Sequence, residues 1–122
     1  MHTKKECLEL IKSVRDIASD PDSAYLLRTR MKRALLSIGR LAAYHAGTET
    51  PRLPGTMSLP DQAPLRSRNL IASCNCLLSS TRKLCQPSEA LDTRWNEGWA
   101  TVIAELAHIE KQLVDWPESL SS

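Results

Sequence analysis

Apolar residues recur along most of this chain at intervals of three and four positions. That spacing places them on one face of an α-helix, which has about 3.6 residues per turn. The alternation of apolar and polar residues that indicates β-strands does not occur between the turn signals. The pattern therefore predicts four amphipathic helices, over residues 4–18, 21–46, 63–85 and 88–116.

Residues with strong capping preferences stand where the first two helices are expected to begin and end. Thr3 and Glu6 have the spacing of a capping box, in which each side chain satisfies a free backbone N–H group. Asp20 can cap the second helix, with Pro21 in its first turn. Gly47 is a natural terminator, because glycine readily adopts the backbone conformation that ends a helix. These signals support the first two predicted ranges.

A long segment rich in proline, residues 47–62, separates the second helix from the third. Pro51, Pro54 and Pro60, together with Gly55, prevent a regular helix there. A connection of this length inside a compact domain is either a functional loop or a crossover between distant helix ends. We expect a surface loop.

The four helices predict an all-α bundle that forms a single domain over residues 1–122. The second and fourth helices have the most regular apolar stripes, close to a seven-residue repeat. The stripes consist of Ala24, Leu27, Met31, Ala34, Ile38, Leu41 and His45, and of Leu91, Trp95, Trp99, Val102, Leu106, Ile109, Leu113 and Trp116. We expect these two helices to pair, either within one chain or with a second copy in a homodimer.

Composition places the chain among ordinary globular proteins, with 42% hydrophobic and 25% charged residues. It contains no apolar run of about 18 residues, so we expect no membrane span. The first residues, beginning Met1-His2-Thr3-Lys4, also lack the apolar stretch of a secretory signal. The sequence therefore predicts a cytoplasmic protein.

Charge is distributed unevenly, although the net charge is only +2. Residues 23–88 contain ten basic residues and two acidic ones, whereas residues 89–122 contain two basic and seven acidic residues. Five of the basic residues belong to the predicted second helix: Arg28, Arg30, Lys32, Arg33 and Arg40. They form either a basic face that binds phosphates or an acidic partner, or a face that the acidic fourth helix, or its copy in a second subunit, neutralises. Both interpretations remain open at this point.

The residues suited to metal binding or catalysis do not form a recognisable site. Cys74, Cys76 and Cys85 cannot reach one zinc ion from an intact helix, because they differ in direction or lie about 16 Å apart along the axis. We expect Cys74 and Cys85 in the core and Cys76 exposed. Glu105 and His108 have the spacing of a di-iron helix motif, but the sequence contains only one such pair. We therefore expect no metal, no cofactor, no catalytic residues and no enzymatic activity.

Trp95 and Trp99 lie one turn apart on the apolar stripe of the fourth helix, and Gly98 between them permits close packing. They are either core residues or anchors of an interface, since tryptophan and arginine are enriched at binding hot spots.

Residues 94–106, RWNEGWATVIAEL, resemble a helix start found in small accessory proteins of bacteriophages and prophages. The resemblance covers about a tenth of the chain, and no site residue carries over from it. It implies a helical protein that binds and inhibits a host protein complex. We therefore expect a non-enzymatic binding protein with a protein partner, and as the alternative a protein that binds nucleic acid or a phosphate ligand through the second helix.

Overall fold

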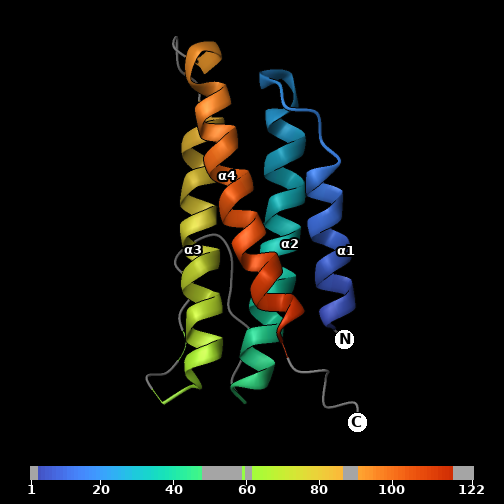
Figure 1. Cartoon of the computed structure of the whole chain (residues 1–122), viewed down its shortest axis with the longest axis vertical. Helices are drawn as coiled ribbons and strands as arrows, with labels where there is room; N and C mark the ends of the chain where they lie inside the picture. The colour runs from blue at the N-terminus through green and yellow to red at the C-terminus, as the bar shows by residue number, and fades with distance from the viewer. Residues whose placement is uncertain (1–2, 48–58, 60–61, 87–90, 117–122) are drawn as a thin grey trace.

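The computed structural model describes residues 3–47, 59, 62–86 and 91–116, and its four α-helices confirm the all-α prediction. The helices are α1 (Lys4–Arg15), α2 (Ala24–His45), α3 (Leu65–Cys85) and α4 (Leu91–Val114), and a short 3-10 helix, η1 (Pro21–Ser23), precedes α2. Consecutive helices run in opposite directions along the bundle (Figure 1). Each helix packs against two neighbours, in the circular order α1, α2, α3, α4.

Helix α1 begins after Thr3, the predicted N-cap residue, but ends earlier than expected. The Thr3 hydroxyl accepts a hydrogen bond from the backbone N–H of Glu6 at 3.1 Å. The helix ends at Arg15, not at residue 18, and a tight turn follows in which the N–H of Ile17 donates to the carbonyl of Val14. Ile17 is nevertheless buried, so the apolar stripe extends past the helix itself.

The α-helix α2 begins three residues later than predicted, because a turn of 3-10 helix precedes it. Asp20 accepts a hydrogen bond from the N–H of Ser23 at 3.1 Å, as a capping residue does. The turn that follows, Pro21–Ser23, is the 3-10 helix η1, and regular α-helix begins at Ala24. Gly47 has a φ of 68° just after α2, in the left-handed region that favours glycine at a helix end.

The core is formed by the apolar faces of all four helices. On α2 the stripe from Leu27 to Leu41 is fully or almost fully buried, and only its two end members, Ala24 and His45, are half-buried. The buried hydrophobic residues of the other helices are Cys7, Ile11 and Val14, then Leu70, Ile71, Cys74, Leu77, Leu78 and Leu84, then Trp95, Val102, Leu106, Ile109 and Leu113. The side chain of Leu91, the first residue of the predicted stripe on α4, lies outside the described part of the structure. Burial of each large aliphatic side chain contributes about 1.5–3 kcal/mol, which is what holds the four helices together.

Helices α2 and α4 lie on a diagonal of the bundle, so the expected pairing of these two helices within the chain is wrong. Both pack instead against α1 and α3. Two acidic side chains of α4 follow this geometry: Glu110 forms an ion pair with Arg15 of α1 at 3.1 Å, and Glu105 accepts a hydrogen bond from Ser80 of α3 at 2.9 Å. Pairing of two copies of the chain stays a prediction.

The cysteines differ in exposure largely as expected. All four are free thiols; Cys7 and Cys74 are fully buried and Cys76 is exposed. Cys85 is half-buried, and its Sγ donates a hydrogen bond to the carbonyl of Ala24 at 3.5 Å. Burial raises the pKa of the Cys74 thiol far above its ordinary value, so this residue is an inert part of the core.

Most of the proline-rich segment 47–62 lies outside the described residues. Helix α2 ends and α3 begins at the same end of the bundle (Figure 1), so the chain between them does not need to cross its length. Among the helices that the structure describes, none combines the length and apolarity needed to cross a membrane.

Candidate binding surface on helix α2

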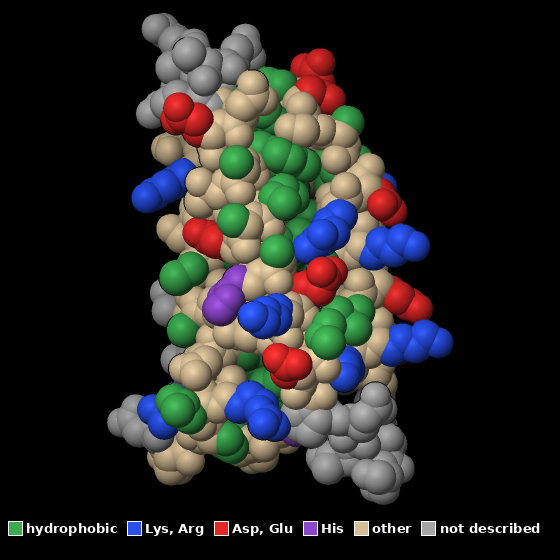
Figure 2. Space-filling model, viewed as in Figure 1, with side chains coloured by type: hydrophobic (Ala, Val, Ile, Leu, Met, Phe, Trp, Pro, Cys, Tyr) green, Lys and Arg blue, Asp and Glu red, His purple; other side chains and the backbone are tan. Residues whose placement is uncertain are grey.

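Helices α2 and α3 are neighbours, and neither contains an aspartate or a glutamate. Together the two helices contain nine basic residues: Arg28, Arg30, Lys32, Arg33, Arg40, Arg66, Arg68, Arg82 and Lys83. Helices α1 and α4, on the other side of the bundle, each contain residues of both signs. Figure 2, in which α4 faces the viewer, shows acidic and basic side chains interspersed there. The fold thus places the excess positive charge on one half of the bundle.

Four of the five basic residues predicted to form a face on α2 do lie on one side of that helix. At about 100° per residue, Arg28, Lys32, Arg33 and Arg40 fall within about 140° of its circumference. The first three are exposed and Arg40 is half-buried.

Arg30 is turned toward α1. Its Nη1 donates a hydrogen bond of 2.7 Å to the carbonyl of Ser13, in the last turn of α1. Positive charge is favourable at that end of a helix, where carbonyl groups point outward. Arg30 therefore joins α2 to α1, and its guanidinium is separated from the other four.

Two exposed tyrosines, which the sequence analysis did not single out, complete this face of α2. Tyr25 is 79% exposed and Tyr44 is 59% exposed, near opposite ends of the helix, and the half-buried Leu36 lies between them. Their only signal in the sequence is that two large aromatic residues occur on the polar face of the helix, outside the apolar stripe. We call the set Tyr25, Arg28, Lys32, Arg33, Leu36, Arg40 and Tyr44 the α2 surface.

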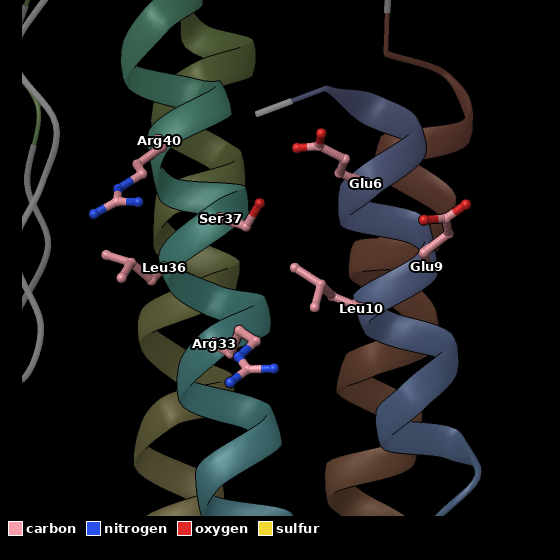
Figure 3. A pocket seen from close by; sticks show the side chains of 7 residues that line it. All are labelled: Glu6, Glu9, Leu10, Arg33, Leu36, Ser37 and Arg40. Atoms are coloured by element: carbon pink, nitrogen blue, oxygen red, sulfur yellow. The ribbon is translucent and has the colours of Figure 1, made fainter. Parts of the chain in front are cut away.

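A groove of about 370 Å³ between α1 and α2 borders this surface on one side. Glu6, Glu9 and Leu10 of α1 line it, together with Arg33, Leu36, Ser37 and Arg40 of α2. In Figure 3 the side chains of Leu10 and Ser37 point toward the opposite helix, whereas Arg40 and Leu36 point away from α1. This groove contains charges of both signs, because α1 supplies two carboxylates to it.

A second groove, of about 230 Å³, lies between α2 and α3. Its lining residues are Arg28, Met31, Lys32, Leu78, Thr81 and Arg82. Three of these are basic and none is acidic. We call it the α2–α3 groove.

The two tryptophans of α4 differ in their surroundings. Trp95 is only 2% exposed and belongs to the core, whereas Trp99 is half-buried and stacks on it with ring centroids 6.1 Å apart. A Cβ atom at Gly98 would lie 2.6 Å from Cδ1 of Leu84, so glycine allows α4 to approach α3 closely here. Of the pair, only Trp99 keeps surface that a partner can contact.

Glu105 and His108, which have the spacing of a di-iron helix motif, contact different neighbours. Glu105 is hydrogen-bonded to Ser80, while the exposed His108 has its Nε2 3.3 Å from the side-chain nitrogen of Gln112. In the part of the chain that the structure describes, no three His, Cys, Asp or Glu side chains are placed to hold a metal ion.

His45 lies at the end of α2, with its ring edge-on to that of Trp116 at a centroid distance of 5.0 Å. Arg66 of α3 lies 5.9 Å from the centre of the same tryptophan ring. Burial lowers the pKa of His45, and the nearby charge of Arg66 lowers it further. His45 is thus a neutral boundary residue at neutral pH.

Comparison of the chain with protein-family models, with curated proteins and with solved structures finds no significant match. The resemblance of residues 94–106 to phage accessory proteins stays a prediction, and this segment lies within α4.

Proposed function

We propose that this chain is a non-enzymatic binding protein whose α2 surface binds an acidic surface of a protein partner. The observation that supports this most directly is the combination of two exposed tyrosines with arginine and lysine side chains on a single helix face. Tyrosine and arginine are enriched at protein interfaces, because they bury large areas and also form hydrogen bonds.

The bundle geometry supports a charged interface. Helix α4 is diagonal to α2, and two of its carboxylates, those of Glu110 and Glu105, contact α1 and α3 and not α2. Positive charge concentrated on one side of a protein accelerates encounter with an acidic partner and disfavours basic ones. The buried stripe on the opposite side of α2 holds the helix rigid, which reduces the entropy lost on binding.

The proposal extends to a phage accessory role, in which the partner belongs to a host protein complex that the chain inhibits. This extension rests on the resemblance of residues 94–106 alone. Its test is whether the partner identified through the α2 surface loses activity when the chain is added.

Photo-crosslinking through the α2 surface tests the proposal. A photoreactive phenylalanine analogue replaces Tyr25 or Tyr44, and the matched control replaces Val114 of α4, which is 57% exposed. In bacterial lysate we expect a protein adduct at positions 25 and 44 but not at 114. Adding Arg33→Glu to the Tyr44 variant should remove the adduct. Equal adducts at all three positions, or an adduct that survives Arg33→Glu, would contradict the proposal.

Nucleic-acid binding is the second candidate, favoured by the absence of acidic residues from both α2 and α3. It makes a separate prediction, because binding to a DNA duplex weakens steeply with salt as counterions are released. Fluorescence anisotropy with a labelled duplex measures this slope. A nuclease-sensitive adduct at positions 25 and 44, together with a steep salt slope, would replace the protein partner by nucleic acid.

A further inference from the structure

The α2–α3 groove combines three cations with an apolar floor. Arg28 and Lys32 are one helical turn apart on α2, so their side chains are neighbours, and Arg82 reaches the same groove from α3. Met31 and Leu78 also line it, and Leu78 is buried and Met31 fully so. All three cationic side chains are exposed, so an anion can reach them from solvent, and the two apolar side chains form the floor beneath them.

No acidic group in the described part of the chain neutralises these cations. Neither helix that forms the groove contains an aspartate or a glutamate, and the ion pair seen among the described residues is the distant one between Arg15 and Glu110. The hydroxyl of Thr81, the other polar group in the lining, donates its hydrogen bond to the carbonyl of Leu77 at 2.8 Å. The charged groups of the groove are therefore all hydrogen-bond donors.

We propose that the α2–α3 groove is a binding site for a phosphate monoester group. Such a group carries a charge of about −1.5 to −2 at neutral pH and three strong acceptor oxygens, which match three cationic donors. Each arginine guanidinium can donate two parallel hydrogen bonds to two oxygens of one phosphate, and Lys32 adds a compact point charge. The site shares Arg28 and Lys32 with the α2 surface. A small phosphate ester nevertheless suffices as its ligand, so this inference does not depend on the proposed protein partner.

The groove between α1 and α2 supplies an internal control. It also contains two arginines, but Glu6 and Glu9 accompany them and repel an anion. Replacing Arg33 there removes the same charge as replacing Arg82. If phosphate only screened the overall positive charge, both substitutions would have the same effect.

Thermal unfolding with inorganic phosphate and with O-phosphoserine, each compared with sodium chloride at equal ionic strength, tests the site. A ligand that binds only the folded state raises the unfolding midpoint, and the rise grows with the logarithm of the ligand concentration divided by its Kd. We expect both phosphates to raise the midpoint of the wild type above the chloride value. Arg82→Gln and Arg28→Gln should each weaken the apparent affinity by about tenfold or more, whereas Arg33→Gln should retain it.

Comparing the two ligands distinguishes a site for phosphate esters from a site for free inorganic phosphate. Stabilisation by O-phosphoserine supports a site for phosphate esters, whereas stabilisation by inorganic phosphate alone would overturn that part of the proposal. No gain over chloride, or an equal loss in Arg33→Gln and Arg82→Gln, would overturn the site itself. Arg28→Gln provides a second variant if Arg82→Gln does not fold. The titration contains no protein partner, so its failure would leave the proposed function of the α2 surface untouched.

Discussion

The side chain of His45, at the end of α2, is partly buried and lies near a positive charge. His45 contacts the ring of Trp116, and its Nε2 is buried without a hydrogen-bond partner in the structure. An unpaired buried nitrogen costs free energy, and a protonated imidazole at this position would cost more, because Arg66 is close. His45 therefore couples the stability of the fold to pH.

The free energy of unfolding should fall as the pH drops below about 6.5, the ordinary pKa of histidine. The pKa of His45 is lowered in the folded state, so the unfolded chain binds more protons in this range and acid favours unfolding. The loss should continue until the pH passes below the lowered pKa. Urea unfolding at several pH values measures it, and His45→Phe should show a smaller dependence than the wild type. His108→Gln, at an exposed histidine, is the control; an unchanged dependence in His45→Phe would contradict the prediction.

On helix α2, Arg30 and Arg33 show how position around a helix gives two different roles to the same residue type. Arg30 is directed to the carbonyl of Ser13 and connects two elements, whereas Arg33 is exposed on the α2 surface. The difference arises because α1 ends beside the start of α2 and offers unpaired carbonyl groups there.

Arg30→Ala should lower the free energy of unfolding by about 1–2 kcal/mol, because it removes a charge-assisted hydrogen bond in a partly buried position. Arg33→Ala should change it by less than about 0.5 kcal/mol, as is usual for an exposed residue. Chemical denaturation of the two variants measures the difference. Partner binding should show the reverse order, with the larger loss in Arg33→Ala. Equal destabilisation by both substitutions would mean that the contact with Ser13 contributes nothing.

At the scale of the whole molecule, folding brings together charges that are spread along the unfolded chain. The basic helices α2 and α3 become neighbours, and the mixed helices α1 and α4 cover the other side. Like charges on one side of a compact molecule repel one another, and salt screens this repulsion within a Debye length of about 10 Å at moderate ionic strength.

Sodium chloride should therefore stabilise the protein in a buffer that contains no phosphate. The double substitution of Lys32→Gln and Arg82→Gln should reduce this effect, because it removes charge from the half that lacks acids. The control, Lys5→Gln with Lys12→Gln, removes the same charge from exposed positions on α1, where Glu6 and Glu9 are present. It should keep the salt dependence of the wild type. Thermal unfolding over a salt series measures both, and identical behaviour of the two double variants would exclude the explanation.

The sequence by itself determined the elements and their buried faces. The stripe from Leu27 to Leu41 and the caps at Thr3 and Asp20 depend on interactions within a few residues, which the order of residues contains directly. The all-α fold could be predicted for the same reason. The exposure of Cys76 and the burial of Cys74 followed from their places around one helix.

Only the tertiary structure decided which helices are neighbours, and therefore which charged side chains lie close together. Regular stripes favoured a pairing of α2 with α4, but an apolar stripe does not specify its partner, and in the bundle the two helices are diagonal. That arrangement placed Arg82 of α3 beside Arg28 and Lys32, and it turned Arg30 toward Ser13. Such contacts join residues far apart in the chain, so local patterns do not contain them.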